Sequence, residues 1–154
     1  MRLIVFLHGT VLMRSTAVGR KRAERAAQVV AGDPATRDYA GYVPVDGAVA
    51  KLRRWHGAGA AIDYLSSHRD PADVAADKLV LRRHGFPDGR VFSRAPGETY
   101  GDLAARERPD VLVEDDCESI GAHHITCPQI PPGGVRAHQA GRRSRVQRHR
   151  PPPG

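Results

Sequence analysis

The stretch RLIVFLHGTVL, residues 2–12, contains five consecutive apolar residues that are followed by His8-Gly9-Thr10. A strand that is apolar at every position is typical of a parallel sheet covered on both faces, because neither face then meets water. Glycine directly after such a run marks a turn. We therefore expect a buried strand, and not a secretory signal, because no small-residue cleavage site follows it.

Strands and helices alternate along the sequence after this first strand. Asp70 followed by Pro71 favours a helix start, with the aspartate as N-cap and the proline as first helical residue. We expect helices over 20–31, 47–57, 70–84 and 99–108, a loop over 38–45, and strands over 60–67, 89–93 and 110–116. This alternation predicts an α/β fold with a parallel sheet and helices on both faces.

The charge of the chain is unevenly distributed. The 154 residues carry a formal net charge of +7, but residues 1–119 hold 18 Lys and Arg against 17 Asp and Glu, a net of +1. From about residue 126 the sequence is rich in Pro, Gly and Arg and has few apolar residues. Such a stretch buries too little surface to offset its chain entropy. We expect one α/β domain over 1–125 and a disordered tail over 126–154.

Composition also indicates the cellular compartment and the binding partners that we expect. The sequence has two cysteines and no apolar run near the roughly 18 residues of a membrane span, so we expect a cytoplasmic protein without a membrane contact. The arginine-rich tail is an alternative, nonspecific contact for nucleic acid through phosphate neutralisation. It lacks aromatic residues for base stacking, which makes nucleic acid the weaker partner.

Polar residues follow three of the expected strands. The carboxyl ends of parallel strands meet at one edge of a sheet, where ligands bind. Arg69 can make a bidentate contact to an anion, and the helix that begins near Asp70 favours an anion at its N-terminus. The alternative is that this segment only caps the helix. The residues of the candidate edge are His8, Gly9 and Thr10, then Ser66, Ser67, His68 and Arg69, then Glu114, Asp115 and Asp116.

Two groups near the last strand carry metal-ligand atoms. Glu114, Asp115 and Asp116 offer the hard oxygens that Mg²⁺ prefers, or else form a solvated acidic turn. The second group has an uncommon zinc spacing, so free thiols in a loop are the favoured interpretation. This second group comprises Cys117, His123, His124 and Cys127.

An apolar strand followed by His-Gly also precedes the oxyanion loop of α/β-hydrolases. That fold requires a nucleophilic serine in a G-x-S-x-G turn. Ser66, Ser67 and Ser119 all lack the flanking glycines. We therefore exclude the α/β-hydrolase fold.

Three segments in order resemble motifs of the haloacid dehalogenase (HAD) superfamily. IVFLHGTVL (4–12) is similar to the first motif, an apolar strand followed by D-x-D-G-T. VDGAVAKLRRWHGAGAAIDYLSSHR (45–69) is similar to the segment leading to the second, and PDVLVEDDCESIGA (109–122) to the last. The resemblance covers 2–122 and implies a HAD-like Rossmannoid core with a small helical cap insert over 13–41.

The resemblance also implies a function and shows where the chain departs from the pattern. Phe6 stands at the position of the family's nucleophilic aspartate and His8 at that of its acid/base. Phenylalanine cannot attack phosphorus, so we expect altered or lost phosphatase activity and binding of a small phosphorylated molecule. His8 remains a candidate acid/base, or else a hydrogen-bonded turn residue. A rival is a metal-dependent phosphohydrolase in which His8 is general base to a metal-bound water.

The resemblance assigns binding roles to the same edge. Ser66 falls where the family hydrogen-bonds a phosphoryl oxygen, and the further candidate phosphate-binding residues at this edge are Gly9, Thr10, Ser67 and Arg69. Glu114 and Asp115 fall where the family holds Mg²⁺, with Asp116 as a further candidate. The family's lysine is missing from the helix at 99–108. Its candidate replacements are Lys78, Arg106 and Arg108.

Overall fold

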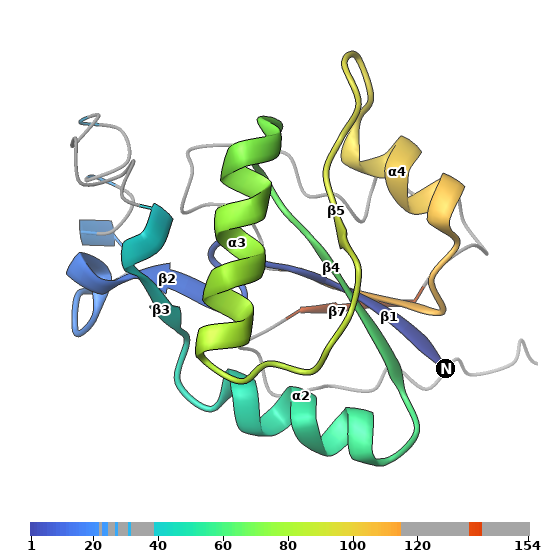
Figure 1. The fold of residues 1–154 in the computed structure, drawn as a ribbon, viewed down its shortest axis with the longest axis horizontal. Helices are drawn as coiled ribbons and strands as arrows, with labels where there is room; N and C mark the ends of the chain where they lie inside the picture. Colours follow the sequence, from blue (N-terminus) through green and yellow to red (C-terminus); the bar gives the residue numbers. More distant parts are fainter. Residues whose placement is uncertain (22, 25–26, 28–30, 32–38, 115–135, 140–154) are drawn as a thin grey trace, which may run out of the picture.

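The computed structural model describes residues 1–21, 23, 24, 27, 31, 39–114 and 136–139. Its core is a five-stranded sheet in the order β5-β4-β1-β6-β7, in which every pair of neighbours is parallel (Figure 1). Its strands are β1 (Arg2–Phe6), β4 (Ala61–Leu65), β5 (Val91–Phe92), β6 (Val111–Glu114) and β7 (Arg136–Gln139). The strand predicted from residues 2–12 is therefore the central strand of the sheet.

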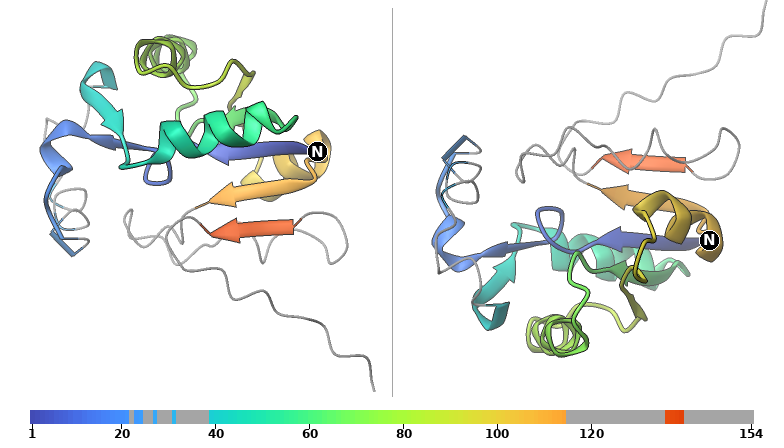
Figure 2. Two further views of the ribbon diagram at one scale, coloured as in Figure 1. Left: turned by 90° about the horizontal axis from the view of Figure 1, so that it is seen from below. Right: turned by 90° about the horizontal axis from the view of Figure 1, so that it is seen from above.

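Helices cover both faces of this sheet. They are α2 (Ala48–Gly57), α3 (Pro71–Arg83) and α4 (Tyr100–Glu107). In Figure 2, α2 lies in front of the strands in one view and α4 in the opposite view. Alternate residues of β1 pack to the two sides, as the pleat requires. Leu3 and Val5 join a cluster with residues of α2 and α3, whereas Ile4 and Phe6 join one with Leu103 of α4. The predicted α/β fold is confirmed.

A small antiparallel pair of strands borders the expected cap insert. β2 (Leu12–Arg14) pairs with β3 (Tyr42–Pro44). The prediction of a loop over 38–45 is wrong for β3, because pairing with β2 supplies partners that local sequence does not reveal. Two short 3₁₀ turns, η1 (Ser15–Ala17) and η3 (Tyr39–Gly41), adjoin the pair. Most of residues 20–38 lie outside the described residues, so the extent of the cap stays a prediction.

The fifth strand lies in the part of the chain that we expected to be disordered. Arg136–Gln139 forms β7 and pairs in parallel with Val111–Glu114 of β6. The prediction for 126–154 therefore differs from the structure at these four residues. Strand pairing uses backbone groups, so a segment poor in apolar side chains can still cover an open sheet edge. The other residues of 126–154 lie outside the described part of the chain.

Among the described residues, no helix combines the length and the apolar character that crossing a membrane requires.

Candidate functional site

The turn after β1 places His8 at the carboxyl edge of the sheet. The Leu7 carbonyl accepts hydrogen bonds from the amides of Val11 (3.0 Å) and Leu12 (2.9 Å). Gly9 has φ of 84°, a left-handed conformation that glycine adopts without a steric penalty. The sequence His-Gly-Thr thus makes a tight turn that leaves the His8 side chain 12% exposed.

The turn after β4 brings Ser66 and Ser67 to the same edge. Ser66 is fully buried, and its amide donates to the Phe92 carbonyl of β5 (2.8 Å). Its hydroxyl donates to Asp77 Oδ2 (2.5 Å) and accepts from the His68 amide (2.9 Å). Ser67, next in the chain, is exposed. The two serines therefore face different surroundings, one inside the protein and one in solvent.

Asp77 of α3 accepts hydrogen bonds from three side chains of the site. Its side chain is 1% exposed and accepts from Ser66, from His8 Nε2 to Oδ1 (3.1 Å) and from His68 Nδ1 to Oδ2 (3.1 Å). The helix is started by Asp70, whose carboxylate accepts from the Ala72 amide (2.8 Å) as predicted. Asp77 lies three residues after the buried Val74, which turns its carboxylate inward to the two histidines.

Opposing influences set the protonation state of Asp77. Burial, the largest, acts to raise its pKa, because a charged carboxylate loses hydration. The hydrogen bonds from His68 and His8, the attraction of His8 and the hydrogen bond from Ser66 outweigh burial, and the pKa of Asp77 is well below its usual range. Asp77 is therefore a carboxylate and accepts every hydrogen bond it makes.

The tautomer of His8 follows from its neighbours. The Ser67 amide donates to His8 Nδ1 (3.4 Å), and an amide N–H cannot accept, so Nδ1 is the acceptor. The proton of a neutral His8 then sits on Nε2 and is donated to Asp77. The Ser67 hydroxyl lies 2.8 Å from the same Nδ1 and donates to it. The ring is held between Tyr42 of β3 and His68, at centroid distances of 5.0 and 4.4 Å.

Three of these side chains could also hold a metal ion. One ligand atom each from His8, His68 and Asp77 lies within 4.8 Å of the other two. Two imidazoles and one carboxylate suit Zn²⁺ and related ions better than Mg²⁺, which prefers oxygen ligands. Of the predicted Mg²⁺ ligands, Glu114 is fully buried at the end of β6, whereas Asp115 and Asp116 lie outside the described residues. The Mg²⁺ site stays a prediction. The cysteine and histidine group at 117–127 lies outside the described residues, so its interpretation as free thiols in a loop stays a prediction too.

Phe6 fills its position with apolar surface. Its side chain is 6% exposed and packs with Leu65 and Leu103. The Tyr100 ring meets it edge to face at a centroid distance of 5.0 Å. This side chain offers no carboxylate, nucleophile or metal ligand, so Phe6 itself supplies no chemistry at this edge.

The remaining predicted residues differ in their exposure and in their partners. Thr10 is buried and Arg69 is exposed. Among the candidate cations, Lys78 is exposed on α3, and Arg108 follows α4 as its exposed, left-handed C-cap. Arg106 forms ion pairs with Glu98 and Glu107.

The structure brings His8, Ser66 and Ser67 together, but their binding and catalytic roles stay predictions. Sequence analysis missed Asp77 and the position of His68 opposite it. A signal for Asp77 was present. Val74, Asp77 and Leu81 are spaced as one inward face of a helix, and an acidic residue on such a face needs partners inside the protein.

Comparison with known proteins identifies the fold. No protein-family model matches the sequence, and no curated protein matches it. A class C acid phosphatase from Bacillus anthracis, solved with tungstate bound, is similar in structure, with a TM-score of 0.53 and 19% identity. The match covers 75% of this chain and 52% of the phosphatase chain.

A chain of the Pnkp1/Rnl/Hen1 RNA repair complex is also similar, with a TM-score of 0.53 and 14% identity over 91% of this chain and 42% of that one. This chain thus spans about half the length of either structure. The likeness shows the fold alone. This is a HAD-like α/β fold.

Proposed function

We propose that this chain binds a phosphate-bearing small molecule at the carboxyl edge of β1 and β4, and that no aspartyl-phosphate forms there. The observation that carries the proposal is the contrast at the end of β1. Phe6 is sealed into an apolar cluster, whereas His8, two residues later, belongs to a polar network that reaches solvent at Ser67. A HAD-like fold with this edge retains polar groups for a phosphoryl oxygen but lacks the family's nucleophile.

The exposed donors of the edge support anion binding. The Ser67 hydroxyl is exposed, and Arg69, two residues further along, presents an exposed guanidinium that matches two phosphoryl oxygens. The N-terminus of α3 begins close by and favours negative charge. Ser66, by contrast, is committed to Asp77, so Ser67 and Arg69 are the residues that we expect to contact the ligand.

This proposal holds with or without a divalent metal, because Ser67 and Arg69 do not need one to contact phosphate. In the described residues, His8, His68 and Asp77 fit an ion of the Zn²⁺ class, and Glu114 with Asp115 and Asp116 remain the candidates for Mg²⁺. Such an ion would neutralise charge on phosphoryl oxygens.

Thermal unfolding with inorganic phosphate or tungstate tests the binding function. A ligand present at 100 times its Kd raises the free energy of unfolding by about 2.7 kcal/mol, which is a readily measured rise in Tm. The measurement is made with and without Mg²⁺ and Zn²⁺. Arg69→Gln should reduce the shift, while Arg54→Gln, an exposed arginine on α2, should leave it unchanged. Identical Tm values with and without both anions would rule the function out.

The second candidate function is hydrolysis with His8 as general base. It is favoured by the His8–Asp77 hydrogen bond, which fixes the ring so that the unprotonated nitrogen Nδ1 faces Ser67. Release of phosphate from p-nitrophenyl phosphate should be lost in His8→Gln, and its loss in EDTA would indicate a metal-bound water. Nucleic-acid binding through the tail stays a prediction, tested by truncation after Pro128.

A further inference from the structure

We propose that Ser67 is a nucleophile for phosphoryl transfer, activated by His8 and oriented through Asp77. The inference rests on the proposed function, since it assumes that a phosphate monoester binds at this edge. It goes beyond that function by naming the atom that reacts, Ser67 Oγ, in place of the aspartate that Phe6 replaces.

The distances form a continuous relay from solvent to the interior. Ser67 Oγ lies 2.8 Å from His8 Nδ1, and His8 Nε2 lies 3.1 Å from Asp77 Oδ1. Both distances are within the reach that general-base activation of a hydroxyl requires. Exposure falls along the same line, from the exposed Ser67 through His8, at 12%, to Asp77, at 1%. The reacting hydroxyl is therefore accessible, while the orienting carboxylate is shielded from water.

The direction of proton transfer follows from the tautomer. Nδ1 of His8 accepts from the Ser67 amide and so carries no proton of its own. It is therefore the ring nitrogen that can take the proton of the Ser67 hydroxyl. As Nδ1 gains that proton, the ring becomes positive, and the Asp77 carboxylate stabilises it through Nε2. The two ring nitrogens are exchanged relative to the usual Ser-His-Asp arrangement, but the roles of nucleophile, base and orienting acid are the same.

Neighbouring groups hold the relay in place. Asp77 is fixed by Ser66 and His68, and the His8 ring by Tyr42 and His68. His68 and Ser66 are positioning residues, since each acts through Asp77. This support explains why a serine without flanking glycines can serve here, because its partner is delivered by the turn after β1 and not by a strained turn of its own.

The reaction balances without a redox partner. Ser67 Oγ attacks the phosphorus atom as His8 Nδ1 takes the hydroxyl proton, and an O–P bond forms. The bond from phosphorus to the ester oxygen breaks, and the departing alcohol takes the proton from Nδ1. Water then attacks the phosphoserine, with Nδ1 accepting one water proton. Serine leaves with that proton, and inorganic phosphate is released.

The experiment looks for the covalent intermediate on the full chain. Protein incubated with p-nitrophenyl phosphate is quenched in acid and digested, and the peptide containing Ser67 is examined by mass spectrometry. We expect one phosphoryl group on Ser67, because a phosphoserine survives acid whereas a phosphohistidine does not. A fluorophosphonate probe, which reacts with activated serines through phosphorus, should label the same residue.

Variants distinguish activation from mere exposure. Ser67→Ala should lose both signals, and Ser15→Ala, an exposed serine of η1, should keep them. His8→Gln and Asp77→Asn should slow labelling on the order of 100-fold or more, with the tungstate-induced Tm rise as the check that the site is still folded. Equal labelling of Ser67 in wild type and His8→Gln would overturn the relay.

The two proposals fail in different ways. A tungstate-induced rise in Tm with no phosphoryl or probe on Ser67 overturns the nucleophile and leaves the binding function standing. Probe labelling of Ser67 without any effect of phosphate or tungstate overturns the binding function and, with it, the phosphate monoester as substrate. Zn²⁺ offers a further check, because an ion held by His8 and Asp77 removes the base and should suppress labelling.

Discussion

Two buried aspartates, Asp63 of β4 and Asp77 of α3, sit in networks that look alike but differ in their cationic partners. Asp63 is 8% exposed and accepts from Arg2 Nε (2.9 Å), Arg90 Nη2 (2.9 Å) and the Arg90 amide (3.0 Å). Burial, the largest influence, acts to raise its pKa, but the hydrogen bonds from Arg90 and Arg2 outweigh burial and lower the pKa. Asp77 has a lowered pKa for parallel reasons, with histidines in place of arginines.

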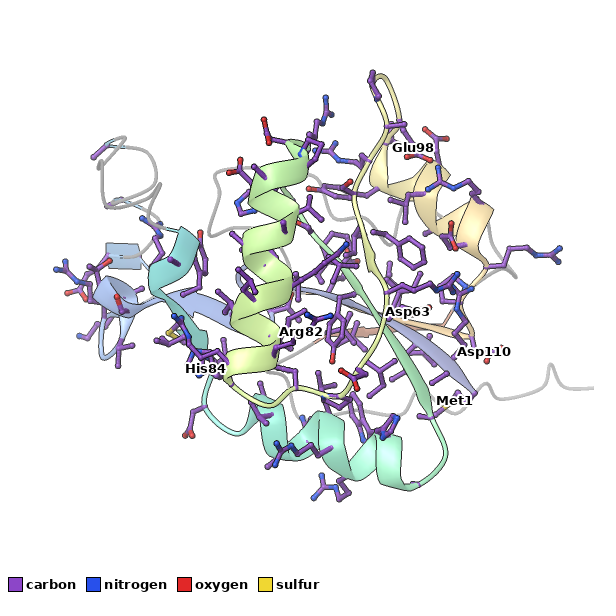
Figure 3. The ribbon with its side chains drawn as sticks, viewed as in Figure 1. Met1, Asp63, Arg82, His84, Glu98 and Asp110 are labelled. Atoms are coloured by element: carbon purple, nitrogen blue, oxygen red, sulfur yellow. The ribbon has the colours of Figure 1, made fainter. Side chains whose placement is uncertain are left out.

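The partners decide what each network can do. Arginine does not release its proton in proteins, so the Asp63 network is a fixed set of charges that ties β1 and β4 to Arg90, the residue before β5. A histidine ring has two nitrogens, one of which can accept a proton while the other donates one, so the Asp77 network suits the proton transfer that we propose. Figure 3 shows Asp63 and Asp110 on the side of Met1. β1 begins at Arg2, which contacts Asp63, and His8 follows the carboxyl end of the strand. The arginines of the Asp63 network therefore carry fixed charges, whereas the histidines of the Asp77 network are the groups to which we assign proton transfer.

Removing the Asp77 carboxylate should have the largest effect. Asp77→Ala leaves the Ser66 hydroxyl and two imidazoles facing a small buried space with no acceptor, which should cost about 3 kcal/mol of unfolding free energy. Urea titration followed by circular dichroism measures this loss. The matched comparison is Asp73→Ala on the same helix, where the side chain is half-buried and the loss should be smaller. Equal losses of unfolding free energy for the two variants would mean that the hydrogen bonds of Asp77 do not stabilise the fold.

Acid should weaken the Asp77 network with a smaller effect than Asp77→Ala, because a protonated Asp77 keeps part of its hydrogen bonding. The folded pKa of Asp77 is lowered, so its stabilisation is complete above the unfolded pKa of about 3.9 and is lost as pH falls below it. Wild type should therefore lose Tm between about pH 4 and pH 2 more steeply than Asp77→Asn, whose side chain does not titrate. Parallel Tm curves for the two proteins would contradict the assignment.

Replacing Asp63 should destabilise less than replacing Asp77. Arg2 keeps a partner in Glu107 (3.2 Å), and the Arg90 side chain is 63% exposed and can be hydrated. We expect Asp63→Ala to cost about 1–2 kcal/mol. Because the change lies outside the carboxyl edge, probe labelling of Ser67 and the tungstate shift should be retained at wild-type levels. A loss of labelling in a folded Asp63→Ala would show that the two networks are coupled.

The first strand and the start of α3 could be predicted from the sequence, because both depend on local residues. The run Leu3 to Leu7 has to be a covered strand, and Asp70-Pro71 has to start a helix, since each rests on neighbouring residues. The parallel topology also predicts that His8 and Ser67 lie at one edge of the sheet, and their side chains are 2.8 Å apart there.

What the sequence could not supply depends on distant contacts. Asp77 is 69 residues from His8, and only the packing of α3 against the sheet brings them together. Likewise, β3 exists through its pairing with β2 and β7 through its pairing with β6. Alternation of strands and helices reports none of these contacts, because each is chosen by what lies across the fold.

Arg90→Ala should give the smallest loss of stability, and it tests whether the Asp63 network depends on charge alone. Arg90 stacks over the Phe92 ring (4.9 Å) and pairs with Asp63, but most of its side chain is in water, where salt screens the attraction. We expect a loss of stability smaller than that of Asp63→Ala, and smaller still in 1 M salt. Asp77→Ala should keep its full loss at the same salt, because its partners are shielded from solvent. The salt dependence of both variants is measured by urea titration. Equal salt dependence would contradict the distinction between the Asp63–Arg90 pair, whose arginine is solvent-exposed, and the buried Asp77 network.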